Sequence, residues 1–512
     1  MSSASALVRR AASSTIGSLF AAQARLFPER VAVEDGAKRL SYAALDNAVN
    51  RAAHAVMRLG VRHGHRVAVL SENRTEYLVL ELACAKVGAI LACQNWRLSP
   101  QELQHCIDLA APSLIAVSER HAGLLSRISI GTIPAIGFGR EWERVLNAAP
   151  DHAVEADIDP EDPLFILYTS GTTGLPKGAV ISHRAEIARS FVMPLDLGIR
   201  SADNILCWPP LYHMGSTEPA LCALLTGGRV IIQDGFDPAR IAEIIARETF
   251  GWISIMPGVV GALIAALERN DLPPKGVGNC GVMPDLVAPQ DIARVTQLLG
   301  ASYCNTFGAT ETGTAPLSGD RIAPGVNTDN LAKTPSAASE IRLVDEDNCD
   351  VPDGDVGELA MRGPTLFSGY WRDDAATAED FRGGWFHMGD LFRRRPDCRY
   401  DYVDRRKYLI KSGGENIYPA EIERVLLGDP RVADAVVVRR KDARWGEVPI
   451  ALVVARETIP DVGELASRCR AALAGFKQPK EFRLVSPERI ARSTTGKIQR
   501  RELEEWVASG QP

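Results

Sequence analysis

Short apolar runs alternate along this chain with segments in which apolar residues recur every three to four positions. The first pattern is typical of strands covered on both faces, and the second is typical of helices that pack against a core on one side. Before residue 260, the apolar runs predict strands at 67–70, 164–168, 205–208, 230–233 and 252–255. This alternation favours an α/β fold with largely parallel or mixed sheets.

Two of the expected helices carry recognisable end signals. The helix at 41–59 has one apolar face and stops at Gly60, a residue type that commonly follows the last turn. Another helix begins at Ser99, with Pro100 in its first turn and Glu102 placed to close a capping box. Both segments are therefore expected to be surface helices packed on a core.

The pattern changes after about residue 390, where a basic polar segment at 393–406 leads into a compact succession of strands and helices. We predict a boundary near 404–407, between a large N-terminal domain at 1–404 and a small C-terminal domain, the lid, at 405–512. The elements expected in the lid are strands at 433–438 and 449–454 and helices at 419–427 and 462–473. The chain is thus expected to be an α/β domain of layered mixed sheets and helices that carries a small, mobile α+β lid.

The composition is that of an ordinary globular protein, because 46% of the 512 residues are hydrophobic and 24% are charged. A net charge of −6 and the lack of a long basic run argue against a nucleic-acid partner.

The longest apolar stretch, 78–93, is interrupted by Glu81 and Lys86, so it predicts a buried helix and strand and not a membrane span. The ten cysteines form no C-x-x-C pair, which is typical of reduced thiols in a cytoplasmic protein. Residues 1–14 combine two arginines and several serines with no acid; a disordered tail is favoured there, with a targeting segment as the alternative.

The strongest chemical signal is the sequence Tyr-Thr-Ser-Gly-Thr-Thr-Gly-Leu-Pro-Lys-Gly at 168–178, which directly follows an apolar run. Glycines and hydroxyl side chains let successive N–H and O–H groups turn toward one anion, and a lysine adds positive charge. The spacing is not that of a Walker loop. We therefore expect a phosphate-binding loop whose contacts come from Thr169, Ser170, Gly171, Thr172, Thr173, Gly174 and Lys177.

Six further motifs follow this loop in a fixed order. They are Pro-Leu-Tyr-His at 210–213, Thr-Phe-Gly-Ala-Thr-Glu at 306–311, Trp-Phe-His-Met-Gly-Asp at 385–390, Asp-Arg-Arg-Lys at 404–407, Ser-Gly-Gly-Glu-Asn-Ile at 412–417 and Thr-Thr-Gly-Lys-Ile at 494–498. Over nearly its whole length the chain resembles the adenylate-forming superfamily, which holds acyl- and aryl-CoA synthetases, luciferases and the adenylation domains of peptide synthetases. The resemblance implies an ATP-dependent carboxylic acid:CoA ligase, which forms an acyl-adenylate with release of pyrophosphate and then an acyl-CoA thioester with release of AMP.

The first half-reaction joins two anions, a carboxylate and a triphosphate, so positive charge has to be fixed around the reacting centre before attack. The resemblance implies that Glu311 holds Mg²⁺ on the phosphates, Thr310 hydrogen-bonds the α-phosphate, and Lys497 bridges the acyl carboxylate and the phosphate. It places the ribose on Asp390 and Arg405, with an ordinary ion pair as the alternative role of the arginine. It also implies that Thr306, Phe307 and Gly308 complete the ATP site.

The resemblance also implies how the thiol step begins. Lys407 would be the hinge about which the lid swings, withdrawing Lys497 and bringing 412–416 toward the active site. Gln478 stands where such a ligase can carry a second phosphate-binding arginine. For the lid residues expected to contact coenzyme A, the alternative role is packing or an ordinary tight turn. The residues expected to contact coenzyme A are Arg97, Gly413, Gly414, Trp445 and Phe476.

The acid pocket is expected from the same resemblance. Its lining would be His213, Met214, Gly215, Ser254, Gly281, Val282, Met283, Thr306 and Gly308. A carboxylate is already ionised near neutral pH, so His213 is expected at the reacting centre as a wall or hydrogen-bond partner and not as a base. The small and apolar members of the set suit an aromatic or a short- to medium-chain acid. Thr217 and Glu218 lie close in sequence and leave a polar tail as the alternative.

Two other classes of protein share part of this signature. An adenylation enzyme of the peptide-synthetase type would load a carrier protein, but the segment 211–214 has no aspartate to pair with an amino-acid ammonium. A non-catalytic nucleotide-binding homologue would be expected to lack Lys497 or Glu311, and both are present. The sequence therefore favours an enzyme that uses a small-molecule acid, ATP, Mg²⁺ and coenzyme A, as a monomer or a homodimer. It does not identify the acid.

Overall fold

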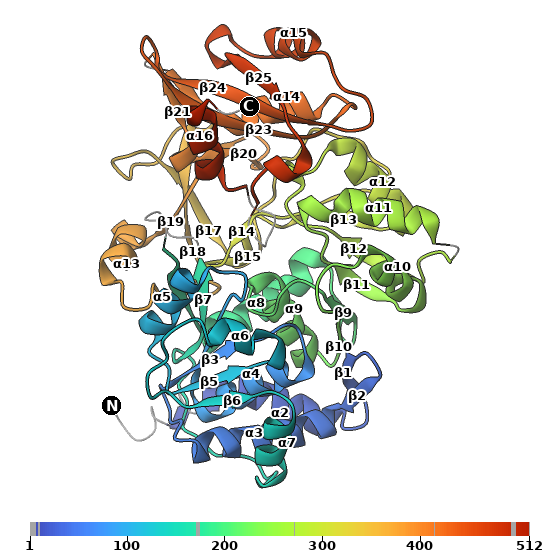
Figure 1. Ribbon diagram of the computed structural model, residues 1–512, viewed down its shortest axis with the longest axis vertical. Coiled ribbons are helices and arrows are strands. Elements are labelled where there is room, and N and C mark those ends of the chain that lie inside the picture. The colour runs from blue at the N-terminus through green and yellow to red at the C-terminus, as the bar shows by residue number, and fades with distance from the viewer. Residues whose placement is uncertain are drawn as a thin grey trace.

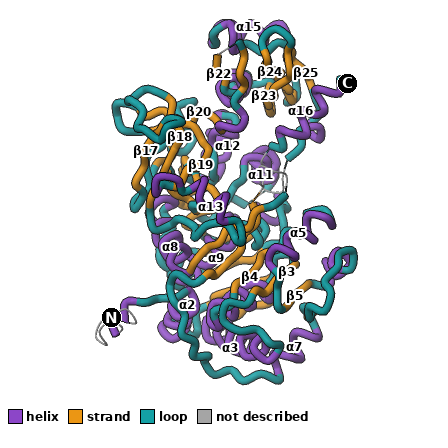
Figure 2. The backbone as a smooth tube through the Cα atoms, turned by 90° about the vertical axis from the view of Figure 1, so that its left-hand side faces the viewer, coloured by secondary structure: helices purple, strands orange, loops and turns teal. Residues whose placement is uncertain are grey.

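The computed structural model describes residues 7–8, 11–169, 175–270, 272–413, 415–492 and 498–510. In Figure 1 the layers formed by the first half of the chain lie at one end of the molecule and the lid, in orange and red, lies at the other. The perpendicular view in Figure 2 preserves this order, with a four-stranded sheet between the lower layers and the lid. Of the expected N-terminal tail, residues 1–6 and 9–10 lie outside the described residues.

The first large sheet has six strands in the order β6-β5-β3-β4-β7-β8, all parallel except β8. The strands are β3 (Arg66–Leu70), β4 (Ile90–Cys93), β5 (Leu114–Val117), β6 (Ala135–Gly137), β7 (Pro163–Thr169) and β8 (Lys177–Ser182). The helices of this part are α2 (Ile16–Leu26), α3 (Tyr42–Arg58), α4 (Thr75–Val87), α5 (Pro100–Ala110), α6 (Ala122–Leu125) and α7 (Arg140–Asn147). Helix α4 is buried on almost every side, as expected for a central crossover helix in an α/β layer.

The second large sheet has eight strands in the order β16-β13-β12-β11-β9-β10-β1-β2, with antiparallel strands only at its two edges. The strands are β1 (Val31–Asp35), β2 (Lys38–Ser41), β9 (Asn204–Cys207), β10 (Arg229–Ile232), β11 (Phe250–Ile253), β12 (Val277–Cys280), β13 (Ser302–Asn305) and β16 (Asp320–Ile322). Helix α8 (His183–Leu197) leads from β8 to β9, and the helices after it are α9 (Met214–Leu225), α10 (Pro238–Arg247), α11 (Val260–Arg269) and α12 (Pro289–Leu299).

Smaller sheets complete the molecule. A two-stranded pair, β14 (Gly308–Ala309) and β15 (Gly313–Pro316), lies beside a four-stranded antiparallel sheet of β17 (Glu340–Val344), β18 (Val356–Arg362), β19 (Phe386–Arg394) and β20 (Tyr400–Arg405). Helix α13 (Asp374–Asp380) connects β18 to β19. The lid sheet contains β21 (Ile410–Ser412), β22 (Glu415–Ile417), β23 (Val432–Asp442), β24 (Gly446–Ala455) and β25 (Glu481–Leu484), with helices α14 (Pro419–Leu427), α15 (Val462–Ala472) and α16 (Arg500–Ser509). Alternate residues of β23 and β24 face two separate small cores, one under α14 and α15 and the other under α16.

The expected fold class is confirmed: a large α/β part of layered mixed sheets carries a smaller α+β lid. The helix expected at 41–59 is α3, where Ser41 Oγ accepts a hydrogen bond from Ala44 N at 3.2 Å. The capping box is also present, since Glu102 N donates to Ser99 Oγ at 3.3 Å and Ser99 N donates to Glu102 Oε2 at 2.9 Å. The stretch 78–93 forms most of α4 and all of β4. Across the described part of the chain, no helix has the length and apolar character needed to cross a bilayer.

Candidate active site

The phosphate loop joins two paired strands. Thr169 ends β7, Lys177 begins β8, and these two residues face each other in the antiparallel ladder. The loop between them is therefore held at both ends by a hairpin. The other predicted contacts of this loop, Ser170, Gly171, Thr172, Thr173 and Gly174, lie outside the described residues.

The predicted metal residue, Glu311, lies in the short turn between β14 and β15. Its carbonyl accepts a hydrogen bond from Phe367 N at 2.9 Å, and its Oε1 accepts one from Tyr370 Oη at 3.2 Å. The ammonium of Lys177 lies 4.7 Å from the centre of the same tyrosine ring. The fold thus places the phosphate-loop lysine and the predicted metal carboxylate on one aromatic side chain, although they are far apart in sequence.

The one residue expected to bind Mg²⁺, Glu311, fits a metal that binds together with the nucleotide phosphates. Within the described ranges, no group of three or more His, Cys, Asp or Glu side chains could hold a metal ion on its own. Magnesium is usually bound by one or two carboxylates together with substrate phosphates and water. A single carboxylate such as Glu311, close to a phosphate loop, is sufficient for that kind of site.

The two residues expected at the ribose form an ion pair across adjacent strands. Asp390 on β19 pairs in register with Arg405 on β20, with Nε to Oδ1 at 2.9 Å and a second contact to Oδ2 at 3.3 Å. The Asp390 side chain is 1% exposed and that of Arg405 is 31% exposed. The nearby Asp390 carboxylate raises the pKa of the arginine, which therefore stays charged. The ion pair expected as an alternative is present, and it holds the carboxylate in one orientation.

The nucleotide and acid residues meet at the end of β13. Thr306 directly follows this strand, and its Oγ1 accepts a hydrogen bond from Met283 N at 3.0 Å. Phe307 packs edge-on against Phe392, with ring centres 4.8 Å apart. Gly308 has no room for a side chain, because an added Cβ would lie 2.0 Å from Gly313 O. Glycine is therefore required where β14 and β15 come together.

The predicted acid-pocket residues lie at the carboxyl ends of neighbouring parallel strands, where ligands of open α/β sheets usually bind. Ser254 follows β11, Gly281 follows β12, and Gly281 N donates to Ile253 O at 2.9 Å. His213 caps α9, and its Nδ1 accepts from Gly215 N at 3.1 Å. The structure therefore brings these residues to one edge of the eight-stranded sheet.

Two details of this edge were not foreseen. Gly281 has a φ of +76°, and an added Cβ would lie 2.2 Å from the ring of Tyr303. The space left by the missing side chain is thus filled by a buried tyrosine and is not open to the acid. The Ser254 hydroxyl is buried and has no hydrogen-bond partner among the described residues. A buried hydroxyl without a partner is costly, so a polar group of a bound acid would be stabilised beside it.

The expected coenzyme A residues are only partly brought together. Gly413 N donates to Trp445 O at 2.8 Å, and both residues belong to the lid. Trp445 is 40% exposed and Phe476 is 38% exposed, so neither belongs to the two lid cores. Arg97 lies on the loop after β4, with its guanidinium 4.7 Å from the ring of Trp96. Gly414 lies outside the described residues.

Lys497 also lies outside the described residues, but its two flanks are described. Arg492 and Ile498 form an antiparallel bridge. Both line a hollow together with Asp285 and Leu286, which closely follow Met283 in sequence. The ends of the segment that carries the expected catalytic lysine therefore lie beside the residues that follow Met283. We call the predicted acid-pocket residues, from His213 to Gly308, the acid wall.

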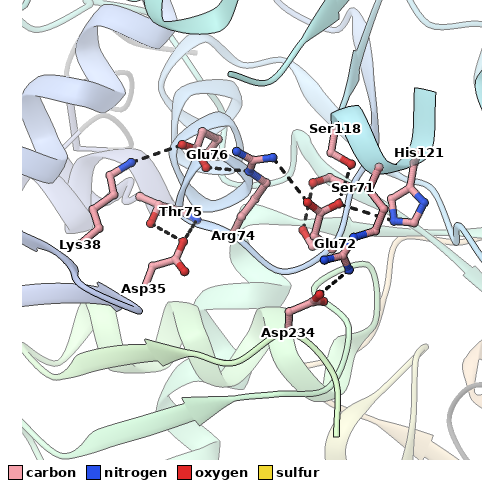
Figure 3. Close-up of polar contacts among 11 residues, drawn as sticks. Asp35, Lys38, Ser71, Glu72, Arg74, Thr75, Glu76, Ser118, His121 and Asp234 are labelled. Atoms are coloured by element: carbon pink, nitrogen blue, oxygen red, sulfur yellow. Dashed lines mark hydrogen bonds and ion pairs between the residues drawn. The ribbon is translucent and has the colours of Figure 1, made fainter. Parts of the chain in front are cut away.

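The sequence did not predict the residue that fixes the turn before His213. Asn73, in the loop after β3, donates through Nδ2 to Pro209 O at 2.7 Å and accepts from Leu211 N at 2.7 Å. This loop is fixed on both sides of Asn73, as Figure 3 shows: Glu72 accepts from Ser118 Oγ at 2.5 Å, and Thr75 N donates to Asp35 Oδ2 at 3.0 Å. Asn73 thus sets the turn that leads to the acid-pocket histidine. The run of polar residues 71–73 just after a buried strand was the signal that could have identified it.

Comparison with known proteins identifies the family. The AMP-binding enzyme family matches residues 20–371, and the AMP-binding enzyme C-terminal domain matches residues 421–497. A feruloyl-CoA synthase from an Amycolatopsis species is 33% identical over 494 residues, which cover 95% of this chain and 98% of that one. An indoleacetate–CoA ligase from Aromatoleum aromaticum is 34% identical over 506 residues, covering 95% and 96%.

A solved structure gives the same result for the fold. The o-succinylbenzoate CoA synthetase of Bacillus subtilis, in complex with its acyl-adenylate intermediate, superimposes with a TM-score of 0.83 at 26% identity. That match covers 95% of this chain and 97% of the other. The chain therefore belongs to the AMP-binding enzyme family and is an ATP-dependent, AMP-forming acid–CoA ligase of the adenylate-forming superfamily.

Proposed function

We propose that this enzyme activates an aromatic carboxylic acid. The observation that carries activation of an acid at this edge is the hydrogen bond from Met283 N to Thr306 Oγ1 at 3.0 Å, because it joins a predicted acid-pocket residue to the segment that leads to the predicted phosphate and metal residues. An acid on the acid wall has its carboxylate directed to the nucleotide. The relatives that act on ferulic acid, indoleacetate and succinylbenzoate support a planar ring as the apolar part of the acid.

Each residue of the site has a task in the first half-reaction. Asp390, fixed by Arg405, accepts hydrogen bonds from the ribose hydroxyls, and Thr310 hydrogen-bonds the α-phosphate. Glu311 would hold Mg²⁺, which would supply positive charge at the phosphates. Lys497 neutralises the attacking carboxylate and the α-phosphate together, so two mutually repelling anions can react. His213 forms a wall and hydrogen-bond partner beside the acid.

We also propose that the chain divides at 404–407 into an adenylation domain at 1–404 and a lid at 405–512. In support, β20 ends at Arg405 in the four-stranded sheet and β21 begins at Ile410 in the lid sheet. Lys407 lies between them in a short 3₁₀ turn, Arg406–Tyr408, where few dihedral angles would have to change. Lys407→Pro should therefore spare adenylate formation and impair thioester formation, and an unaffected second step would contradict this hinge.

The acceptor thiol in this proposal is free coenzyme A, in contact with Gly413, Trp445 and Phe476 of the lid and with Arg97 of the adenylation domain. The exposure of the two lid aromatics supports this, because packing residues would be buried. The ten unpaired cysteines support a location in the reducing cytoplasm.

One experiment tests the function. A panel of aromatic, short-chain and medium-chain carboxylates is incubated with ATP and Mg²⁺, with and without coenzyme A, and pyrophosphate and AMP are measured. We expect acid-dependent pyrophosphate release that is highest with an aromatic acid, and AMP release that requires coenzyme A. A preference for aliphatic acids would overturn the aromatic assignment, and AMP release that requires a carrier protein would overturn the free thiol.

A further inference from the structure

The segment 367–371, which we call the strap, contacts both parts of the phosphate site. Its backbone donates from Ser368 N to Val180 O at 2.8 Å and from Trp371 N to Gly178 O at 2.7 Å, both on β8. At its other end Phe367 N donates to Glu311 O at 2.9 Å. The strap therefore connects the strand that leaves the phosphate loop with the turn that carries the predicted metal carboxylate.

The side chain of Tyr370 repeats this connection. Its hydroxyl lies 3.2 Å from Glu311 Oε1 and 3.0 Å from Asp380 Oδ2, at the end of α13. Its ring lies 4.7 Å from the ammonium of Lys177, in the range of a cation–π contact. The side chain is 8% exposed, so its orientation is fixed by packing. One residue thus contacts the cation of the phosphate loop and the anion of the metal site.

The number of protons on the phenol limits what this hydroxyl can do. A tyrosine carries one O–H proton, which it donates to one acceptor at a time. Two carboxylate oxygens, Asp380 Oδ2 at 3.0 Å and Glu311 Oε1 at 3.2 Å, share access to this one proton, so the hydroxyl lies between the two side chains and orients the carboxylate that accepts from it. Its contact is with Oε1 of Glu311, and among the described residues no partner of Oε2 is found.

We propose that Tyr370 is a positioning residue, which holds the Glu311 carboxylate and the Lys177 ammonium at the separation that a Mg²⁺-bound triphosphate requires. This inference rests on the proposed function, because the tyrosine acts through two residues assigned to that site. Asp380 is the anchor of the tyrosine hydroxyl, at the end of a helix that leads from the strap toward β19.

Two substitutions separate the contacts of the tyrosine. Tyr370→Phe keeps the ring beneath Lys177 and removes the hydroxyl, whereas Tyr370→Leu removes both. The matched control is Tyr400→Phe, a buried tyrosine of β20 whose carbonyl and amide pair with Lys333. All variants are first compared with the wild-type protein by thermal unfolding without ligands.

The first measurement is the Mg²⁺ concentration that gives half-maximal pyrophosphate release at saturating ATP and acid. The second is calorimetric binding of a non-hydrolysable ATP analogue with Mg²⁺, which does not depend on turnover. Loss of one hydrogen bond to a charged group should raise the Mg²⁺ requirement and weaken analogue binding, each by about 10-fold, in Tyr370→Phe. Tyr370→Leu should weaken analogue binding further at saturating Mg²⁺, since it also releases Lys177. Tyr400→Phe should match the wild type in both.

The inference is overturned if Tyr370→Phe lowers turnover but leaves the Mg²⁺ requirement and analogue binding unchanged, as a purely structural role would. If Tyr370→Phe does not fold, Asp380→Asn provides the test. An unchanged Mg²⁺ requirement in Asp380→Asn would then overturn the inference. The proposed function fails separately. If the Tyr370 variants bind the ATP analogue more weakly but the wild-type protein makes no AMP with any acid, the positioning role is supported and the assigned reaction is contradicted.

Discussion

Lys333 Nζ lies 2.5 Å from Asp285 Oδ2, and the lysine side chain is 0% exposed. The same ammonium donates to Asn305 Oδ1 at 2.5 Å. Asp285 closely follows the acid-wall residue Met283, and Asn305 directly precedes Thr306. This buried ion pair therefore holds together the two backbone segments that the Met283–Thr306 hydrogen bond joins, and it sets the shape of the acid wall.

Asp285→Asn tests that relationship. The substitution removes the negative charge opposite a buried ammonium and leaves it only neutral amide oxygens as acceptors, and breaking a buried ion pair in this way typically costs about 3–5 kcal/mol. We expect a lower free energy of unfolding in urea and a larger rise of KM for the acid than of KM for ATP, because the acid wall moves. Equal changes in the two KM values would show that the pair has no specific link to the acid.

Removing both charges of the Lys333–Asp285 pair is a control for the effect of the unpaired lysine. Lys333→Met with Asp285→Leu removes both charges and should recover part of the lost stability, since no unpaired buried charge remains. A double variant less stable than Asp285→Asn would contradict this account. Arg456 and Asp291 form a comparable pair at the surface, with both contacts at 3.1 Å, and Asp291→Asn should change stability by no more than about 1 kcal/mol.

Lys497→Ala should separate the two half-reactions. Without the ammonium, the carboxylate and the α-phosphate repel each other, so acid-dependent pyrophosphate release should fall about 100-fold or more. Thioester formation from a supplied acyl-adenylate should be largely retained, because that step needs no triphosphate. Lys441→Ala, at an exposed position on β23, is the matched control and should affect neither step. Equal loss of both half-reactions would contradict the assigned role.

Gly413→Ala tests the coenzyme A assignment. The residue has a φ of +59°, and an added Cβ would lie 2.7 Å from the Trp445 ring, so the ring or the turn must shift. We expect adenylate formation to be retained and thioester formation to fall, with a raised KM for coenzyme A. Gly510→Ala introduces the same kind of backbone strain at φ +67° with nothing within 4 Å, and it should leave both steps intact. Loss of adenylate formation in Gly413→Ala would place the glycine in the first step instead.

The buried carboxyl of Glu81 should make the stability of the protein depend measurably on pH. Burial raises the pKa of this carboxyl to about 8, while hydrogen bonds from Thr217 oppose the shift. Between the unfolded pKa, near 4.5, and about 8 the folded state binds the extra proton, so stability falls as pH rises through this range. The slope from this single group is about 1.4 kcal/mol per pH unit.

Glu81→Gln should remove this slope, because a glutamine is neutral at every pH. Urea unfolding at pH 5.5 and pH 7.5 should show a smaller loss of stability for the variant than for the wild-type protein. Glu243→Gln, at a side chain that is 57% exposed, should leave the slope unchanged. A wild-type slope that persists in Glu81→Gln would show that other buried carboxyls, such as Glu186, are responsible.

Features that depend on neighbouring residues were predictable from the sequence. The strands expected before residue 260 appear within about two residues of their predicted positions; the run at 252–255, for example, is β11 at Phe250–Ile253. The capping box at Ser99 is equally local. Hydrophobic periodicity and capping act within a few positions of the chain, so a single sequence contains them.

Contacts between distant segments were decided by the tertiary structure. Tyr370 and Glu311 are 59 positions apart, and they meet because the strap pairs with β8 beside the turn that carries Glu311. Lys333 pairs with Asp285, and the Tyr303 ring fills the space beside Gly281, for the same reason. The order of strands in a sheet decides which side chains become neighbours, and that order depends on how the layers pack together, which no local pattern of residues specifies.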